Sequence, residues 1–189
     1  LPIAKVEPNV SQPRAYFDEV ALTELAESIK QHGMIQPITV RKLESGYYQI
    51  IAGERRWRAA RMAGLEEVPV SIIQADDRMA AELALVENLQ RADLNPIEEA
   101  LGYRSLMEDF ELTQEEVAQS VGKSRPAISN SLRLLALPQE VLELVLAGQL
   151  TAGHARALLA IEDDAVKIEA ARLIVKKGMS VRQTEALAV

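Results

Sequence analysis

The chain has 189 residues, of which 48% are hydrophobic, so it can form one large or two small domains with their own cores. It contains no cysteine, which excludes disulfides, thiolate metal ligands and cysteine nucleophiles and is compatible with a cytosolic location. No apolar run is long enough to cross a bilayer. The formal net charge of −7 argues against nucleic-acid binding by the chain as a whole, although affinity follows the local potential more than the total charge.

The first half of the chain alternates strand-like and helix-like patterns. These patterns predict strands over 3–6, 38–41, 48–51 and 68–73, and helices over 22–31, 55–62 and 78–89. No strand pattern follows Asn95, which is a good N-cap before Pro96 at a first helical position. The sequence therefore predicts an α+β protein, with a small N-terminal α/β domain over residues 1–93 and an all-α domain over residues 94–189.

The segment Gly53-Glu54-Arg55-Arg56 lies where a predicted strand meets a predicted helix. A helix N-terminus presents unpaired N–H groups and a partial positive charge, and glycine lets the backbone approach a ligand closely. Arginine adds fork-shaped donors that match phosphate oxygens. The segment therefore predicts a phosphate site. A solvated basic helix start, paired with Glu54 or Glu66, is the alternative that local evidence leaves open.

Two other polar clusters are less specific on local evidence. Glu87 and Asn88 lie near the end of a predicted helix, and a carboxylate beside an amide oxygen can hold Mg²⁺, which usually keeps phosphate oxygens as further ligands. A solvated helix end explains the same residues. The other cluster, Gln12-Pro13-Arg14, lies in a proline-rich turn. No Walker A pattern is present, because Gly122-Lys123-Ser124 lacks the earlier glycine, so any nucleotide would have to be held in another way.

Residues 113–135 have the pattern of a helix-turn-helix. Thr113 and Glu116 have capping-box spacing, Gly122 permits a tight turn, and Ser124 can cap a second helix. That helix is predicted to bury Ile128, Leu132 and Leu135 and to expose Arg125, Ser129, Asn130 and Arg133. No acidic residue lies between 122 and 138, so this basic strip is suited to a DNA major groove. The alternative is an ordinary helical hairpin with surface arginines.

Four further helices are predicted over 140–147, 152–160, 165–176 and 181–187. His154 lies in the second of these, where a lone histidine is more often a packed or capping residue than a catalytic one. Because the chain opens without methionine and stops within a predicted helix, we expect it to be a fragment of a longer protein.

Together these motifs resemble those of the ParB family of chromosome- and plasmid-partitioning proteins, over nearly the whole chain. The resemblance rests on Gln12-Pro13-Arg14, Gly33-Met34-Ile35-Gln36-Pro37-Ile38, Gly53-Glu54-Arg55-Arg56-Trp57-Arg58-Ala59-Ala60, Glu87-Asn88-Leu89-Gln90-Arg91 and the turn Gly122-Lys123-Ser124-Arg125-Pro126. It implies a ParB/sulfiredoxin-like fold for the first domain. Sulfiredoxin chemistry needs a cysteine, so this chain cannot be a sulfiredoxin.

The resemblance implies that the first domain binds CTP and, with Mg²⁺, hydrolyses it slowly to CDP and phosphate. The implied CTP-binding residues are Gln12, Arg14, Gly33, Ile35, Gln36, Gly53, Glu54, Arg55, Arg56, Ala59, Glu87 and Asn88. Glu87 and Asn88 would hold Mg²⁺, and Gln12 would be the catalytic residue that orients the attacking water. Cytidine selectivity is expected from main-chain groups around Gly33 to Pro37.

The same resemblance implies that the second domain reads a palindromic, centromere-like parS site in double-stranded DNA. The implied DNA-binding residues are Gln114, Lys123, Ser124, Arg125, Ser129, Ser131, Arg133, Ala136 and Gly153. Arg125 opens the recognition helix, where an arginine can bond guanine in bidentate fashion. The nucleoid-occlusion paralogue tends to carry glutamine there, so the set resembles the partition type more.

In this family CTP closes the N-terminal domains of a homodimer into a sliding clamp around DNA. We therefore expect a bacterial, cytoplasmic, nucleoid-associated protein with no membrane partner. The family's C-terminal dimerisation domain, and the N-terminal segment that contacts a ParA-type ATPase, are expected to be missing from this chain. The alternatives are a nucleoid-occlusion paralogue, a plain helix-turn-helix transcriptional regulator, and a ParB-like small-molecule kinase, which would leave the helix-turn-helix unexplained.

Overall fold

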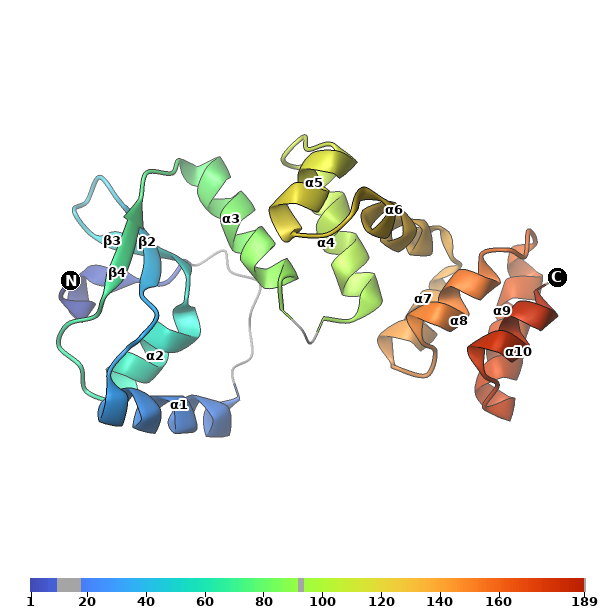
Figure 1. The fold of residues 1–189 in the computed structure, drawn as a ribbon, viewed down its shortest axis with the longest axis horizontal. Helices are drawn as coiled ribbons and strands as arrows, with labels where there is room; N and C mark the ends of the chain where they lie inside the picture. Colours follow the sequence, from blue (N-terminus) through green and yellow to red (C-terminus); the bar gives the residue numbers. More distant parts are fainter. Residues whose placement is uncertain (10–17, 92–93, 189) are drawn as a thin grey trace. The chain divides into compact units, whose positions relative to one another are not determined.

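The computed structural model describes residues 1–9, 18–91 and 94–188 (Figure 1). Its contacts divide the chain into two compact units, Leu1–Glu87 and Asn88–Val189. The first unit combines a small sheet with helices, and the second is helical throughout its described residues. The predicted fold class is confirmed.

The sheet of the first unit has four strands in the order β1-β3-β2-β4. The strands are β1 (Val6–Glu7), β2 (Ile38–Lys42), β3 (Tyr48–Ala52) and β4 (Val70–Ile73). β2 and β3 form an antiparallel hairpin, while β1 lies parallel to β3 and β4 lies parallel to β2. Since β3 runs directly into the next helix at Gly53, the sheet determines where that helix begins.

Two helices, α1 (Glu19–His32) and α2 (Glu54–Met62), cover one side of the sheet (Figure 1). Trp57 and Ala60 pack in the cluster that contains the sheet residues, whereas Ala59 packs against α1. α2 therefore lies between the sheet and α1, and both alanines are fully buried. Small side chains at this double contact let the helices approach closely, which holds the start of α2 in place.

The expectation of a first strand over 3–6 is wrong in part, because Ile3–Lys5 forms a 3₁₀ turn and only Val6–Glu7 pairs as a strand. The Ile3 N–H donates to the Glu66 carbonyl at 2.9 Å, so the turn is held by the loop before β4. The last predicted strand also begins later, at Val70 rather than at residue 68. Pro69 has no N–H to give to a ladder, although its carbonyl accepts from Ile38 at 3.0 Å.

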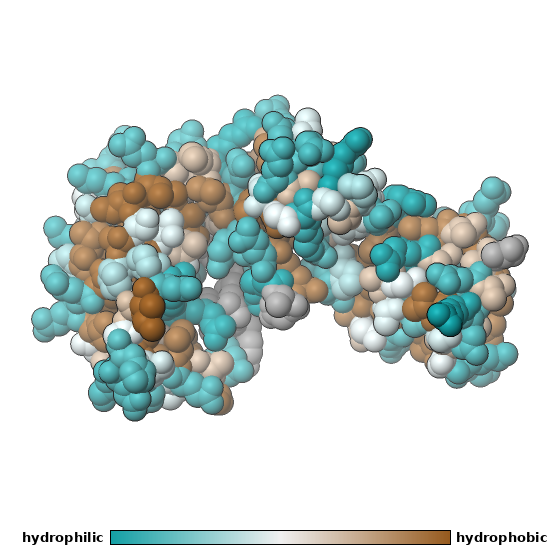
Figure 2. Space-filling model, in the orientation of Figure 1, coloured by the Kyte–Doolittle hydropathy of each residue, from teal (hydrophilic) through white to brown (hydrophobic). Residues whose placement is uncertain are grey.

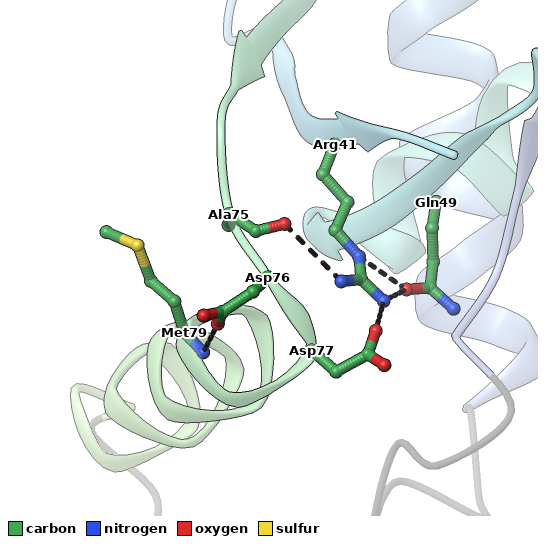
Figure 3. A network of polar contacts seen from close by, with 6 residues as sticks. All are labelled: Arg41, Gln49, Ala75, Asp76, Asp77 and Met79. Carbon is green, nitrogen blue, oxygen red and sulfur yellow. Dashed lines mark hydrogen bonds and ion pairs between the residues drawn. The ribbon is translucent and has the colours of Figure 1, made fainter. Parts of the chain in front are cut away.

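A polar network on Arg41 joins two strands to the start of α3 (Asp77–Leu89). The guanidinium donates from Nε and Nη2 to Gln49 Oε1 at 2.9 and 2.7 Å, and from Nη2 to Asp77 Oδ1 at 2.6 Å (Figure 3). It also donates from Nη1 to the Ala75 carbonyl at 3.4 Å. The Arg41 side chain is only 11% exposed, so this network fixes the start of α3 against the sheet.

The division between the two units falls inside α3, between Glu87 and Asn88. Just beyond it, Leu89 packs against Gly102 so closely that an added Cβ on the glycine would lie 2.4 Å from Leu89 Cδ2. The last turn of α3 therefore packs within the helical unit. The sequence placed the boundary at residue 93, which lies outside the described residues.

The helical unit follows the predicted order of helices. Its elements are α4 (Pro96–Glu108), α5 (Gln114–Val121), α6 (Arg125–Arg133), the 3₁₀ turn η2 (Leu134–Ala136), α7 (Gln139–Leu146), α8 (Ala152–Leu158), α9 (Asp164–Lys177) and α10 (Val181–Leu187). Side chains from α4, η2, α7, α8 and α9 form one core cluster. In the residues that the structure describes, none of the helices of either unit has the length and apolar character to span a membrane.

Candidate functional site

The junction of β3 and α2 at residues 53–56, called here the β3–α2 corner, has the local geometry of an anion site. Gly53 is the N-cap with φ 102°, in the left-handed region that favours glycine, and it has no side chain to cap the helix. The first α-helical bond is donated by Trp57 to the Gly53 carbonyl at 3.1 Å. The amides of the first turn are therefore left without helical partners, as at any helix start. A phosphate oxygen is a suitable acceptor for them.

Arg56 lies across this corner and reaches a second predicted segment. Its Nη1 donates to the main-chain carbonyls of Gln36 at 3.0 Å and Pro37 at 2.5 Å. A Cβ added to Gly53 would lie 2.9 Å from Arg56 Nη2, so the guanidinium packs directly on the glycine. The structure thus brings together Gly53, Arg56 and Gln36, which the sequence had placed in separate motifs.

The other charged residues of the corner are Glu54 and Arg55. Glu54 is 9% exposed, and its Oε1 accepts from Arg58 Nε at 3.0 Å and Nη2 at 2.7 Å. This i,i+4 pair joins the carboxylate to Arg58 of the same helix start, which is a pairing of the kind that the alternative named for Glu54. Arg55 is exposed. Ala59 is fully buried against α1, and its contact with CTP stays a prediction.

The loop of residues 33–37 begins at the end of α1. Gly33 is the C-cap with φ 74°, and its N–H donates to the Ile29 carbonyl at 2.8 Å. Ile35 is 87% exposed, which is unusual for a side chain of this size, and Gln36 is exposed as well. The loop therefore offers main-chain groups and one apolar side chain beside Arg56.

Gln12 and Arg14 lie outside the described residues. Glu87 is exposed, and the Asn88 Oδ1 accepts from Arg91 Nη1 at 3.3 Å. Within the described ranges, no cluster of three or more His, Asp or Glu residues could enclose a metal ion. Carboxylate and amide oxygens nevertheless suit Mg²⁺, which takes few protein ligands and keeps phosphate oxygens and water. The two residues therefore fit Mg²⁺ by donor type.

The helix-turn-helix formed by α5 and α6 has the predicted caps. Glu116 Oε2 accepts from the Thr113 N–H at 2.8 Å and Thr113 Oγ1 accepts from the Glu116 N–H at 3.3 Å, which makes a capping box. Gly122 ends α5 with φ 70°, and Ser124 Oγ accepts from the Ala127 N–H at 3.3 Å to open α6. The predicted helix-turn-helix is confirmed.

The predicted DNA-binding residues differ in how much of each side chain solvent can reach. Of the three residues predicted to face inward, Ile128 is fully buried, whereas Leu132 and Leu135 are only half-buried. Exposed residues are Lys123, Ser124, Arg125, Arg133 and Ala136, and half-buried residues are Gln114, Ser129, Ser131 and Gly153. Arg125 is the first residue of α6, with no acidic residue in that turn. The ammonium group of Lys123 forms an ion pair with Glu99 of α4.

At the start of α8, Gly153 and His154 have packing and capping roles. An added Cβ on Gly153 would lie 2.8 Å from Val181 Cγ2, so glycine is needed for the contact between α8 and α10. The His154 Nδ1 lies 3.2 Å from the Thr151 N–H, and its Nε2 lies 3.0 Å from the Met179 carbonyl. Since Nδ1 accepts, Nε2 carries the proton and donates. His154 is thus a capping residue, as expected.

Sequence reasoning missed three residues that complete these sites: Arg58, Glu99 and Tyr103. The pairs Glu54–Arg58 and Glu99–Tyr103 have i,i+4 spacing, a signal that could have found them. The pair Glu99–Lys123 joins different helices and has no local signal.

An α/β domain followed by a helix-turn-helix domain defines a class of DNA-binding protein. The family of the ParB N-terminal domain matches residues 1–89, and that of the ParB HTH domain matches residues 92–189. The chain belongs to the ParB family. This confirms the resemblance found in the sequence.

Two of the curated relatives that this chain resembles carry chromosome-partitioning names. The chromosome-partitioning protein Spo0J of Thermus thermophilus is 55% identical over 187 residues, which is 99% of this chain and 68% of the relative. The chromosome-partitioning protein ParB of Caulobacter vibrioides is 51% identical over 189 residues, which is 99% of this chain and 61% of the relative. The chain therefore spans about two thirds of the length of these relatives.

Among solved structures, the C-terminally truncated ParB of Caulobacter crescentus, complexed to the centromeric parS site, is 50% identical to this chain. It covers 99% of this chain, the match covers 96% of that chain, and the TM-score is 0.88. A structure of that protein complexed with CTP-gamma-S is also 50% identical over 92% of this chain and 96% of its own. The TM-score of this match is 0.46.

Proposed function

We propose that this chain is the CTP-binding and DNA-binding part of a chromosome-partitioning protein, a CTP-dependent clamp on parS-like DNA. One observation carries the proposal. Arg56 bonds the loop of residues 33–37 while it lies on Gly53, so residues of two family motifs meet at the start of one helix. A ligand that contacts both segments would be expected to bind where they meet.

In this proposal the β3–α2 corner holds the triphosphate. The first-turn amides of α2 would donate to phosphate oxygens, and the exposed Arg55 would add a guanidinium. Arg56 would contact phosphate with donors other than the Nη1 group that holds the loop. Arg56 bonds the carbonyls of Gln36 and Pro37. The neighbouring main-chain groups would select the base, which the family resemblance identifies as cytosine.

Glu87 and Asn88 would hold Mg²⁺, which neutralises phosphate charge when it is bound. Gln12 would orient the attacking water, because an amide can both donate and accept. Phosphoryl transfer depends on positioning and charge neutralisation, so a site without a strong general base is expected to be slow. Slow hydrolysis to CDP and phosphate would act as a timer for clamp opening.

The second domain would read parS through α6, which would enter the groove with Arg125 at its N-terminal end. The parS complex of the Caulobacter crescentus relative supports this part of the proposal. Palindromic sites are read by dimers, so a second copy of the chain is the expected partner. A ParA-type ATPase would bind a segment outside this chain, and the protein would work in the cytoplasm on the nucleoid.

Exposed hydrophobic side chains on the first unit offer a surface for the second copy. Ile72 on β4 and Met79 on α3 are 53% and 48% exposed. Figure 2 shows hydrophobic surface on this unit where β4 leads to α3. Exposed apolar patches commonly mark association sites, which is consistent with clamp closure through the N-terminal domains.

Hydrolysis of CTP, measured with and without a parS duplex, tests this function. The proposal predicts slow release of phosphate that the parS duplex stimulates and that a scrambled duplex does not. Gln12→Ala should retain CTP binding and lose hydrolysis. A plain helix-turn-helix regulator predicts no turnover and no CTP-dependent cross-linking between copies, and that result would overturn the proposal.

A further inference from the structure

Lys123 is held by a carboxylate that belongs to another helix. Its ammonium group forms an ion pair with Glu99 Oε1, and the Tyr103 hydroxyl donates to the same oxygen at 2.5 Å. The ammonium also lies 5.9 Å from the centre of the Tyr103 ring. One carboxylate oxygen on α4 therefore serves both a tyrosine and the lysine of the helix-turn-helix turn.

The surroundings keep the tyrosine hydroxyl protonated and the lysine charged. Burial, and then the hydrogen bond to Glu99, raise the pKa of Tyr103 to about 12, so its hydroxyl stays a donor at neutral pH. The hydrogen bond to Glu99 is the largest of the causes that raise the pKa of Lys123, which therefore stays charged. The ion pair cancels the positive charge that Lys123 would otherwise present to DNA.

The ion pair lines a hollow beside the recognition helix α6. Glu99, Tyr103 and Lys123 line a hollow of about 440 Å³ together with Ser124, Asn130, Ser131 and Arg156. The Lys123 side chain is 44% exposed, so another anion can approach its ammonium group. The Glu99 side chain is 23% exposed. Its carboxylate also accepts a hydrogen bond from the Tyr103 hydroxyl, which holds it in place.

We propose that Glu99 is an internal competitor for DNA, a carboxylate that occupies Lys123 until a backbone phosphate displaces it. Glu99 thereby keeps Lys123 from binding the phosphates of non-specific DNA. The additional base contacts of parS can drive the displacement of Glu99, so that Lys123 binds phosphate in the parS complex. Glu99 acts through Lys123 and is a positioning residue that sharpens the discrimination between parS and other DNA. This inference rests on the proposed DNA binding by α6.

The salt dependence of binding to a non-cognate duplex is the direct test. Each phosphate contact adds about 0.9 to the slope of log K against log salt concentration. Glu99→Gln keeps the shape and the acceptor for Tyr103 but removes the charge, so the slope should steepen by about 0.9 and binding at low salt should tighten several-fold. Affinity for parS should change less, so the ratio of parS to non-cognate affinity should fall.

Glu115→Gln is a matched control, because Glu115 is an exposed acid of the same unit and its removal changes the net charge equally. In a Lys123→Gln background the Glu99→Gln effect should disappear, and thermal melting of each variant reports whether it is folded.

A Glu99→Gln slope no steeper than that of Glu115→Gln overturns the inference, as does an effect that persists without Lys123. Failure of the parent protein to bind any duplex would instead refute DNA binding itself. The two failures are therefore distinguishable.

Discussion

Arg56 Nη1 lies 2.5 Å from the Pro37 carbonyl oxygen, and this contact joins the start of α2 to the loop that follows α1. The donor is charged and the acceptor belongs to the main chain, so it is a strong hydrogen bond with little freedom. It holds the Arg56 guanidinium over Gly53. The side chain proposed to meet phosphate is thus positioned by the protein before any ligand arrives.

Gly53→Ala should weaken both stability and nucleotide binding. A side chain at φ 102° costs about 1–3 kcal/mol, and the new Cβ would push Arg56 away from its position. The loss of stability can be measured in denaturant from the fluorescence of Trp57, the single tryptophan, which is buried in the first unit.

Gly64→Ala is the control for this variant, because Gly64 also has positive φ, 76°, but has open space where a Cβ would be. It should lose comparable stability and retain CTP affinity. Equal CTP affinity in both variants would show that the geometry of Arg56 at Gly53 does not matter for binding.

Arg41→Ala should destabilise the first unit by about 2 kcal/mol, because it leaves the Gln49 Oε1 and the Ala75 carbonyl without their charged donor. Asp77→Ala should cost less than 1 kcal/mol, because the Asp77 side chain is 95% exposed and such pairs are screened by water. Unfolding in urea measures both. Equal losses would mean that the ion pair, rather than the bonds to Gln49 and Ala75, carries the stabilisation.

The capping box of α5 should make stability depend on pH. Hydrogen bonds from the Thr113 N–H and then from its hydroxyl lower the pKa of Glu116 from its ordinary value of 4.5. A lowered folded-state pKa gives stability that is complete above pH 4.5 and is lost as the pH falls through the folded-state pKa. Glu116→Gln keeps the acceptor without the charge. The parent should be the more stable protein at neutral pH, and the difference should vanish in acid.

Thermal melting of the helical unit across this pH range measures the difference. A gap between parent and Glu116→Gln that is independent of pH would contradict the role of the ionised carboxylate.

Helices whose ends carry local signals were predictable from the sequence. Asn95 caps α4 as expected, Thr113 and Glu116 form the capping box that their spacing indicates, and Gly122 ends α5 with positive φ. These signals involve residues within one helical turn of each other, so they can be identified without knowing the tertiary structure. The end of α10 at Leu187 was likewise predicted.

Contacts between distant segments were not predictable. The turn at Ile3–Lys5 depends on the loop at Glu66. The start of α3 depends on Arg41, whose partners lie on a neighbouring strand, in the connection after β4 and on the first residue of α3. The end of α3 packs on Gly102, which the sequence gives no reason to expect. Tertiary packing decides such features, and it can override local propensity.

In the candidate site, too, local features were predictable and contacts between distant segments were not. The motif at residues 53–56 indicated a helix start suited to phosphate, and α2 begins there with Gly53 as its N-cap. The bond from Arg56 to the carbonyls of Gln36 and Pro37 was not indicated, because it joins segments about twenty residues apart. The ion pair of Lys123 with Glu99 likewise changes the electrostatics of a turn that looked simply basic in the sequence.

Calorimetric titration of the protein with CTP and Mg²⁺, parent against Arg56→Ala, tests the central claim that a nucleotide's phosphates bind at the β3–α2 corner. Loss of a charged hydrogen bond to phosphate, worth about 2 kcal/mol, should weaken CTP binding at least tenfold. Arg61→Ala is the control, because Arg61 stacks on Trp57, 5.0 Å from its ring centre, and its loss changes the charge equally. The account predicts a large loss of affinity for Arg56→Ala and little for Arg61→Ala. Unchanged CTP affinity in Arg56→Ala would contradict it.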